Sequence, residues 1–445
     1  MTDLQQLYDR ANALEAQGQF AEALADFESL LLEKPDVALG WFQRGNILQR
    51  LERFGDAIMS YERALALDKA LFEAWCGKGG ALHRLDRFEE AVASYGRAIR
   101  LEPDYGEAFY NRGLSFTELG LYAEAISDYD RAVRLDAHAD EARKNKAISL
   151  LVQGRLKEGW PLYEARARRK DERIAARSQW QGQDISGKTL LLHHEQGLGD
   201  TIQFCRYARL CAARGAKVVM LVQTPLVGLL RQLAPEIRVI GPGELHPAFD
   251  FQCPMLSLPL AFATTLETIP ANGPYLSADA AKMEEWRARL KPGAKPRIGI
   301  AWRGAPGHKN DARRSIPLEQ WRGLLEANCD FIALQKEIEG ADLDVAPGRI
   351  AIFGGQQKDF SDTAAMIALT DLVVTVDTSI AHLAGAMGKP VFILLPFNPD
   401  WRWLLTRSDS PWYASATLFR QARIGDWAEV MERVKETLPG LQARA

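Results

Sequence analysis

The segment "LVVTVDTSIAHLAGAMGKP", residues 372–390, contains side chains that can hold an anion. Its apolar start indicates a buried strand ending at Val376, and Gly388 followed by Pro390 closes the helix after it. Free N–H groups and the dipole at a helix N-terminus attract negative charge, and side chains three or four residues apart share one helix face. We predict an anion site formed by Asp377, Thr378, Ser379 and His382. The alternative is an ordinary N-cap with His382 as a packing residue.

A second turn from strand to helix lies in "EQGLGDTIQF", residues 195–204. A dinucleotide fingerprint would need a third glycine where Ile202 stands. An aspartate at this helix start would repel a phosphate, whereas the helix dipole favours an ionised carboxylate there. We therefore expect an ionised Asp200 in a loop formed by Gln196, Gly197 and Gly199. A simple N-cap role for Asp200 remains the alternative.

Positive charge gathers in "AWRGAPGHKNDARRSIP", residues 301–317, after a third predicted strand. Lysine and arginine in a glycine-bearing loop at a cleft edge would neutralise a diphosphate leaving group. The side chains concerned are Arg303, His308, Lys309, Arg313 and Arg314. The alternative is a solvated basic loop.

Aromatic side chains cluster in "LLPFNPDWRWLLTRSDSPWY" among Asp400, Arg402 and Arg407. Aromatic faces with interleaved charge suit a sugar or a nucleobase. The alternative, favoured for each aromatic taken singly, is a clamp between two lobes. The residues are Trp401, Trp403, Trp412 and Tyr413.

These motifs lie in a region of alternating strands and helices. The β-rich runs "TLLLHH", "KVVMLV" and "IRVIG" alternate with amphipathic stretches, "CPMLSLPLAFATT" is typical of helix and linker, and a second series begins at "RIGIAWRG". Such alternation predicts parallel βαβ units. With a linker near residues 290–296, it indicates two Rossmann-like lobes facing a cleft, with ligands at the carboxyl ends of the strands.

The first part of the chain repeats every 34 residues, from Trp41, Trp75 and Phe109. Small residues recur four positions later, and aromatic and alanine positions follow in phase, with weaker units on either side. A helical solenoid of about five repeats is predicted, whose concave face would bind an extended peptide. The expected groove residues are Tyr8, Asn12, Phe42, Asn46, His83, Arg84 and Tyr110. Solvated or inter-repeat packing positions are the alternative.

Composition narrows the function classes. The chain has 445 residues and a formal charge of −3, so we expect about three domains and no nucleic-acid partner. No apolar run reaches the ~20 residues of a membrane span, and "MTDLQQLYDR" lacks the pattern of a secretory signal. Five scattered cysteines fit reduced thiols. The sequence therefore predicts a cytoplasmic protein without a transmembrane segment.

Two family resemblances follow from these motifs. The 34-residue unit resembles the tetratricopeptide repeat. "VDTSIAHLAGAMGKP", together with the "GD" helix start, resembles the heptosyltransferase-like group, glycosyltransferase family 9, which has the GT-B fold. The resemblance implies a tetratricopeptide-repeat domain at 1–176, an acceptor-side GT-B lobe at 177–292 and a nucleotide-sugar lobe at 293–445. The expected fold class is thus an α solenoid followed by an α/β GT-B unit.

The resemblance also implies roles for residues. The proposed base of the heptosyltransferases falls on Asp200, and their donor-diphosphate group falls on Asp377, Thr378, Ser379 and His382. Their phosphate-contacting lysine falls on Arg314, a departure because a planar fork replaces a point charge. Lys309 would add charge at the nucleotide-sugar site, and a ribose-contacting carboxylate would fall near Glu337.

The implied reaction is an inverting, metal-independent transfer from a nucleotide-sugar, used as substrate with no cofactor, to an acceptor hydroxyl. The repeats would present a protein as the acceptor. One alternative is a non-catalytic adaptor with a degenerate GT-B domain. The other is transfer to a saccharide or a lipid-linked acceptor.

Overall fold

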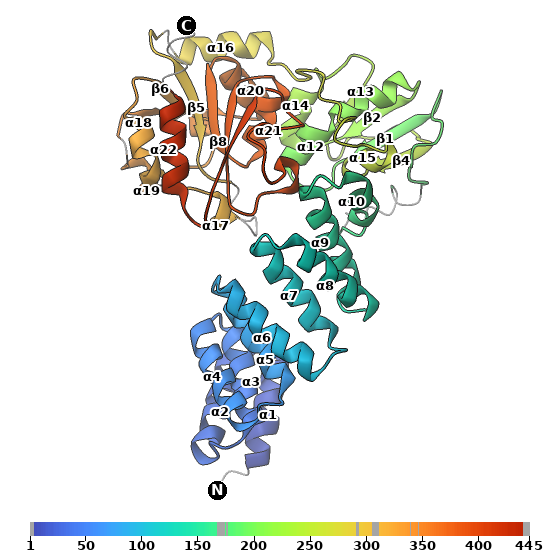
Figure 1. Cartoon of the computed structure of the whole chain (residues 1–445). Helices are drawn as coiled ribbons and strands as arrows, with labels where there is room; N and C mark the ends of the chain where they lie inside the picture. Colours follow the sequence, from blue (N-terminus) through green and yellow to red (C-terminus); the bar gives the residue numbers. More distant parts are fainter. Residues whose placement is uncertain are drawn as a thin grey trace. The chain divides into compact units, whose positions relative to one another are not determined.

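The computed structural model describes residues 4–166, 174, 177–290, 293–304, 311–338, 340–345 and 347–438. Contacts within the chain divide it into two compact units (Figure 1). One unit comprises Met1–Leu150 and Leu162–Arg166, and the other comprises Leu151–Pro161 and Ala167–Ala445.

The N-terminal part of the chain is helical and follows the predicted period. Its helices are α1 (Leu4–Ala16), α2 (Phe20–Glu33), α3 (Ala38–Arg50), α4 (Phe54–Leu67), α5 (Phe72–Arg84), α6 (Phe88–Leu101), α7 (Gly106–Glu118), α8 (Tyr122–Arg134), α9 (Ala139–Val152) and α10 (Leu156–Tyr163). Equivalent helices begin 34 residues apart, since α3, α5 and α7 begin at Ala38, Phe72 and Gly106. Each pair is joined by a short turn, so the predicted helix-turn-helix repeat is confirmed.

The small residue of each repeat lets two helices approach closely. A Cβ atom added at Gly45 of α3 would lie 2.6 Å from Tyr61 Cε1 of α4, closer than real atoms come. Tyr61 is fully buried against this glycine. The same contact recurs one period later between Gly79 and Tyr95, and again between Gly113 and Tyr129. The sequence period therefore records a repeated packing contact.

The second unit contains two parallel sheets. The first consists of β1 (Thr189–His193), β2 (Lys217–Leu221), β3 (Arg238–Ile240) and β4 (Phe251–Pro254), in the order β3-β2-β1-β4. The second consists of β5 (Arg297–Ala301), β6 (Asp330–Ala333), β7 (Ile350–Ala351), β8 (Leu372–Val376), β9 (Val391–Leu395) and β10 (Ala416–Arg420), in the order β10-β9-β8-β5-β6-β7. All pairings within both sheets are parallel. The predicted α/β class with two lobes is confirmed.

Helices and short 3-10 turns (η) connect these strands. Those of the first lobe are α12 (Leu198–Phe204), α13 (Arg206–Ala213), η1 (Thr224–Leu226), α14 (Val227–Leu230), η2 (Met255–Ser257) and α15 (Leu258–Ala261). They are followed by α16 (Ala280–Leu290), α17 (Asp311–Arg314), η3 (Leu318–Trp321), α18 (Arg322–Leu325), α19 (Gly340–Leu343), η4 (Gly354–Gln356), α20 (Phe360–Ala368), α21 (Ser379–Ala386), η5 (Trp401–Trp403) and α22 (Trp427–Thr437).

The second sheet is covered by helices on both faces, as its buried central strands require. Both β8 and β9 are buried at every position. Val430 and Val434 of α22 pack with Ile300 of β5 and Val374 of β8 in one core cluster. Figure 1 shows α22 and α18 on one side of this sheet and α20 and α21 on the other. Because these strands are buried along their whole length, the polar side chains of a site have to come from the loops at their ends.

Two strands differ from the sequence analysis. "CPMLSLPLAFATT" was expected to be helix and linker, but Cys253 and Pro254 end strand β4, which pairs with β1. Pairing with a buried neighbour overrides local propensity here, and a short apolar run has no decisive period. Strand β10 was not expected, and it pairs with β9 at the edge of the second sheet.

Helix α16 precedes the second sheet in the chain but packs on one of its helices. Lys282 Nζ of α16 lies 2.7 Å from Asp362 Oδ1 of α20, and the Trp286 indole N–H donates to the same oxygen at 3.0 Å. The boundaries 1–176, 177–292 and 293–445 stay predictions, with α16 bridging to the lobe that follows it.

Candidate functional site

The predicted motifs lie at the points where strand order reverses. In the first sheet the chain proceeds from β1 to β2 and β3 and then returns to β4 on the other side of β1. In the second it proceeds from β5 to β6 and β7 and returns to β8 beside β5. Ligands of doubly wound sheets bind outside the carboxyl ends of strands at such reversals. The loops after β1, β5 and β8 carry the predicted site residues except Glu337, which follows β6.

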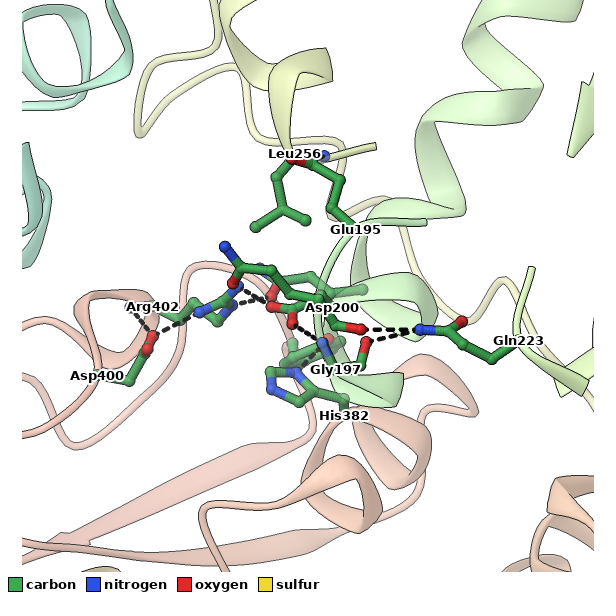
Figure 2. A network of polar contacts seen from close by, with 11 residues as sticks. Glu195, Gly197, Asp200, Gln223, Leu256, His382, Asp400 and Arg402 are labelled. Carbon is green, nitrogen blue, oxygen red and sulfur yellow. Dashed lines mark hydrogen bonds and ion pairs between the residues drawn. The ribbon is translucent and has the colours of Figure 1, made fainter. Parts of the chain in front are cut away.

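The helices that follow two of these strands meet end to end. A Cβ atom at Gly199, in the first turn of α12, would lie 2.7 Å from His382 Cδ2 and 3.5 Å from the Ser379 Cα, both on α21. A larger residue at this position would push the two helix starts apart. The "GLGD" and "DTSIAH" motifs, which stand in different lobes, therefore form a single site, and His382 lies beside Asp200 in Figure 2.

Asp200 occupies the first turn of α12 and closes that turn. Its Oδ2 accepts a hydrogen bond from the Gly197 backbone N–H at 2.8 Å. Its Oδ1 forms an ion pair with Arg402 (Figure 2). Burial raises the pKa of Asp200, and the Arg402 guanidinium opposes that rise. The side chain keeps 16% of its surface exposed, so a reacting group can reach it.

Gln223 holds the loop that precedes Asp200. Its amide nitrogen donates to the backbone carbonyls of Gln196 at 3.0 Å and Gly197 at 3.3 Å (Figure 2). Its oxygen accepts a hydrogen bond from the Thr201 hydroxyl at 2.9 Å. Gln223 follows β2, so the neighbouring strand of the sheet fixes the position of the predicted acceptor-side loop.

Arg402 is the central cation of the network, and the sequence analysis did not assign it a role at Asp200. It is 5% exposed and binds Asp200, Asp400 Oδ1 at 2.8 Å and Gln203 Oε1 at 2.5 Å. Its guanidinium lies over the Trp401 ring, 4.3 Å from the centroid. The available signal was an arginine between two tryptophans in "DWRW", since stacked arginine is typical of buried ion pairs.

The predicted anion motif forms the other wall of the site. Thr378 is the N-cap of α21, and its hydroxyl oxygen accepts a hydrogen bond from the Ile380 N–H at 3.2 Å. Ser379 is the first residue of that helix. Burial, together with the nearby Asp400 carboxylate, raises the pKa of Asp377 to about 7. The N-cap predicted as the alternative role is thus present. The Ala381 N–H donates to the Thr378 carbonyl at 3.0 Å, so among the described residues the cap leaves the Ser379 N–H of the first turn for a ligand.

His382 is buried in an aromatic surround. It is 6% exposed, its ring stacks on Trp403 at 5.3 Å between centroids, and its Nδ1 lies 2.9 Å from the Tyr413 hydroxyl. Burial and the nearby Arg402 hold the pKa of His382 well below its ordinary value. The imidazole is therefore neutral near pH 7 and could offer a hydrogen bond to an anion but no positive charge.

The basic loop contributes one arginine to the anion motif. Arg314 Nη1 donates to the Asp377 backbone carbonyl at 3.0 Å, and Arg314 Nε lies 3.3 Å from Asp311 Oδ1. Arg303 is turned to another partner, because its Nη2 lies 3.4 Å from Asp342 Oδ2. His308 and Lys309 lie outside the described residues.

Glu337, the expected ribose contact, is exposed in the loop after β6. Its backbone carbonyl accepts a hydrogen bond from Gln335 Nε2 at 3.0 Å. Gln335 Oε1 in turn accepts the Trp302 backbone N–H at 2.9 Å. Glu337 is thus tied to the end of β5, but nothing places its carboxylate on a ligand, and its role stays a prediction.

A buried donor at this site remains unsatisfied. Gln203 is fully buried, and its Nε2 has no hydrogen-bond partner in the part of the chain that the structure describes. Its oxygen is held by Arg402, which fixes the amide beside the Asp200 network. Buried polar groups without partners usually mark the place of a water or a ligand atom.

The aromatic cluster holds the two lobes together. Trp401, Trp403, Trp412 and Tyr413 are at most 2% exposed, so they form the clamp described as the alternative in the sequence analysis. Arg206 of α13 enters this cluster from the first lobe and donates to the Trp412 carbonyl at 2.9 Å and to the Tyr275 hydroxyl at 2.8 Å. The lobes meet through buried polar and aromatic contacts around the site.

The predicted groove residues of the repeats are half-buried, except Arg84, which is exposed. Tyr8 packs edge-on against Phe27, and Phe42 packs on Tyr61. Asn46 accepts a hydrogen bond from the Tyr61 hydroxyl at 2.8 Å, and Tyr110 stacks on His138. Their part in binding a peptide stays a prediction.

No helix among the residues that the structure describes is long and apolar enough to cross a membrane.

Comparison with known families agrees with this architecture. The tetratricopeptide repeat matches residues 8–71, 42–105, 76–140 and 110–173. Glycosyltransferase family 9 (heptosyltransferase) matches residues 356–420, a segment that includes the Asp377 to His382 motif and Arg402 but neither Asp200 nor Arg314. Such repeats are protein-binding modules in general.

A curated relative and solved structures also match. Protein FlbA of Caulobacter vibrioides is 29% identical over 318 residues, which cover 65% of this chain and 53% of FlbA. The chain thus spans about half the length of this curated relative. Among solved structures, MamA from Desulfovibrio magneticus RS-1 and YrrB, described as a TPR protein with an unusual peptide-binding site, are each 20% identical with a TM-score of 0.33. Each covers 37% of this chain, which covers 92% and 84% of those chains respectively. The chain is a tetratricopeptide-repeat protein that carries a heptosyltransferase-like segment of glycosyltransferase family 9 in its C-terminal α/β part.

Proposed function

We propose that the second unit is a glycosyltransferase that moves a sugar from a nucleotide-sugar to an acceptor hydroxyl, with inversion and without a metal, and that the repeats recruit a protein as the acceptor. The observation that carries the proposal is the contact between Gly199 and His382. It sets the acceptor-side carboxylate of one lobe beside the helix start that would hold the donor diphosphate in the other.

In this reaction Asp200 takes the proton of the acceptor hydroxyl as its oxygen attacks the anomeric carbon. The bond from that carbon to the diphosphate oxygen breaks, and the nucleoside diphosphate leaves with the electron pair. The Ser379 N–H, the dipole of α21 and the Arg314 guanidinium would stabilise the leaving charge. Arg402 holds Asp200 in place through Oδ1, and the 16% of the Asp200 side chain that is exposed is where the acceptor hydroxyl would approach.

Burial supports the assignment of Asp200 as a base. A carboxylate at its ordinary pKa is a weak base near neutral pH, and burial raises the pKa of Asp200. Because His382 is neutral, Arg314 and the α21 dipole would have to stabilise the negative charge on the leaving group.

The proposal is tested with a panel of ADP-, UDP-, GDP- and CMP-sugars. Hydrolysis or transfer by the whole chain is compared with that of Asp200→Asn, for which a loss of about 10²- to 10⁴-fold is expected. Asp409→Asn is the matched control, because Asp409 pairs with Arg407 at the surface, 66% exposed. Equal rates for all three proteins would remove Asp200 from the mechanism, and no turnover with any donor would oppose the enzyme assignment.

A non-catalytic adaptor is the second candidate, and one observation favours it. Arg402 occupies one Asp200 oxygen and the Gly197 N–H occupies the other, so the carboxylate is engaged as a structural contact. Thermal shift with the same nucleotide-sugars separates the two candidates. An adaptor should show neither turnover nor a change in melting temperature. An enzyme that lacks only its acceptor should show a rise in melting temperature with its nucleotide-sugar. Ser379→Pro, which removes a first-turn N–H, should make that rise smaller.

A further inference from the structure

A ladder of ion pairs runs along the repeat helices. Each consists of a basic residue and an acidic residue 16 positions earlier. The pairs are Arg44–Glu28 at 2.8 Å, Lys78–Glu62 at 2.7 Å and Lys146–Asp130 at 2.6 Å. The basic members Arg44, Lys78, Arg112 and Lys146 follow the 34-residue period, and so do their acidic partners except one.

In α6 the position of the repeat that should hold the acidic residue is occupied by Gly96. One period after Glu62 and one before Asp130 stands a glycine, so Arg112 binds Asp128 instead, at 2.7 and 2.8 Å. A Cβ atom at Gly96 would lie 3.7 Å from Arg100 Nη1 and 3.7 Å from Arg112 Nη1. Two guanidinium groups thus converge on the place of the missing carboxylate.

The surface at this gap is hollowed. Two hollows of about 600 Å³ each share Trp75, Lys78, Arg97 and Arg100 in their lining, and Gly96 and Arg112 line one of them. Both arginines of α6 are exposed. Within the described residues neither Arg97 nor Arg100 has an acidic side chain at ion-pair distance, so their charges are available to a partner.

The surface formed by these two hollows is separate from the predicted concave groove. Trp75 and Lys78 stand one position before and two positions after Cys76, the equivalent of Phe42 in the next repeat. At about 100° per residue, they occupy a different side of their helix. The Trp75 ring is half-buried, with its indole N–H bound to the Lys69 carbonyl at 3.2 Å and Lys78 Nζ 5.9 Å from the ring centroid, and the ring lines both hollows.

We propose that the groove formed by Trp75, Lys78, Gly96, Arg97, Arg100 and Arg112 binds an acidic peptide segment of a partner protein. A glutamate or aspartate of the peptide would sit over Gly96 between Arg100 and Arg112, where the ladder lacks its acid. An apolar side chain next to it would lie on Trp75. Glu62 and Glu90 also line the hollows, and this mixed charge suits separate carboxylates better than the continuous charge of a nucleic acid or membrane. The site does not depend on transferase activity.

The test measures fluorescence polarisation of a fluorescein-labelled dodecapeptide of alternating leucine and glutamate with the whole chain. The same peptide with lysine for glutamate is the reference. Gly96→Glu restores the missing acid and should weaken binding of the acidic peptide at least about tenfold while raising the melting temperature. Gly96→Ala adds only a Cβ at ordinary contact distance and should change binding by less than about threefold.

Arg100→Gln provides a second variant that does not alter the helix backbone, and it should also weaken binding. Equal binding of the acidic and basic peptides would overturn the proposal, and so would equal binding by Gly96→Glu and Gly96→Ala. Loss of binding in Phe42→Ala but not in Gly96→Glu would move the peptide to the concave groove. Stronger, Gly96-dependent binding of anionic vesicles or of an oligonucleotide would reject a peptide as the occupant.

Discussion

Arg402 binds the Asp200 carboxylate although the two residues stand 202 positions apart in the chain. The same guanidinium binds Asp400 and Gln203 and is nearly inaccessible to water. The network therefore forms only when the start of α12 and the turn at η5 are brought together. The position of the candidate base in one lobe therefore depends on a side chain of the other.

Replacing Arg402 by methionine should destabilise the second unit. The change leaves the Asp200 and Asp400 carboxylates without their shared cation, and breaking such a pair typically costs about 3 kcal/mol or more. Urea unfolding of the whole chain measures the loss. Arg407→Met is the control, since its pair with Asp409 is exposed and should cost about 0.5 kcal/mol or less. Similar effects of the two substitutions would mean that the Arg402 network contributes little.

Replacing Gly199 by alanine should separate the two helix starts. Its Cβ atom would enter the His382 ring space, and overpacking of this kind costs about 1–3 kcal/mol. Gly323→Ala in α18 is the control, because its Cβ atom would meet only ends of the Lys435 and Glu432 side chains, at 3.7 Å or more. Thermal unfolding should show a lower midpoint temperature for Gly199→Ala than for the wild type. The control should unfold at the wild-type midpoint. If Gly199→Ala unfolds at the wild-type temperature, the contact is not tight.

The sequence predicted the parts of this molecule that repeat or follow simple local rules. The 34-residue period marked Gly45 and Tyr61 as recurring small and aromatic positions, and the strand-to-helix turns located Asp200 and Thr378. Arg402 was not assigned, because a pair 202 residues apart leaves no periodic trace. Strand β4 was missed because its four residues have no decisive pattern and its pairing with β1 is a tertiary contact.

The stability contributed by His382 should fall as the pH falls. Its folded pKa lies well below the ordinary 6.5, so under acid conditions the unfolded chain binds a proton that the folded chain does not. The free energy of unfolding of the wild type, measured against His382→Gln, should therefore decline below pH 6.5 by up to about 1.4 kcal/mol per pH unit. Denaturant titrations at pH 8, 6.5 and 5.5 measure it. A constant difference across these values would show that the ring titrates normally in the fold.

Asp377 should have the opposite dependence. Burial and Asp400 raise its folded pKa to about 7 from the ordinary 3.8, so between these values the folded chain keeps a proton that the unfolded chain has lost. Its contribution is complete below pH 3.8 and is lost as the pH rises through 7. Relative to Asp377→Asn, the wild type should lose up to about 1.4 kcal/mol per pH unit in that window and then level off.

Urea unfolding at pH 5, 6, 7 and 8 measures this dependence on Asp377. Asp409→Asn is the control: Arg407 lowers the Asp409 pKa, so its linkage lies at or below 3.8 and its effect should stay constant from pH 5 upward. A difference between the wild type and Asp377→Asn that stays constant from pH 5 to 8 would mean that Asp377 is already ionised in the fold at pH 5. The carboxylate would then oppose an anion at the start of α21, and the diphosphate would have to bind nearer to Arg314.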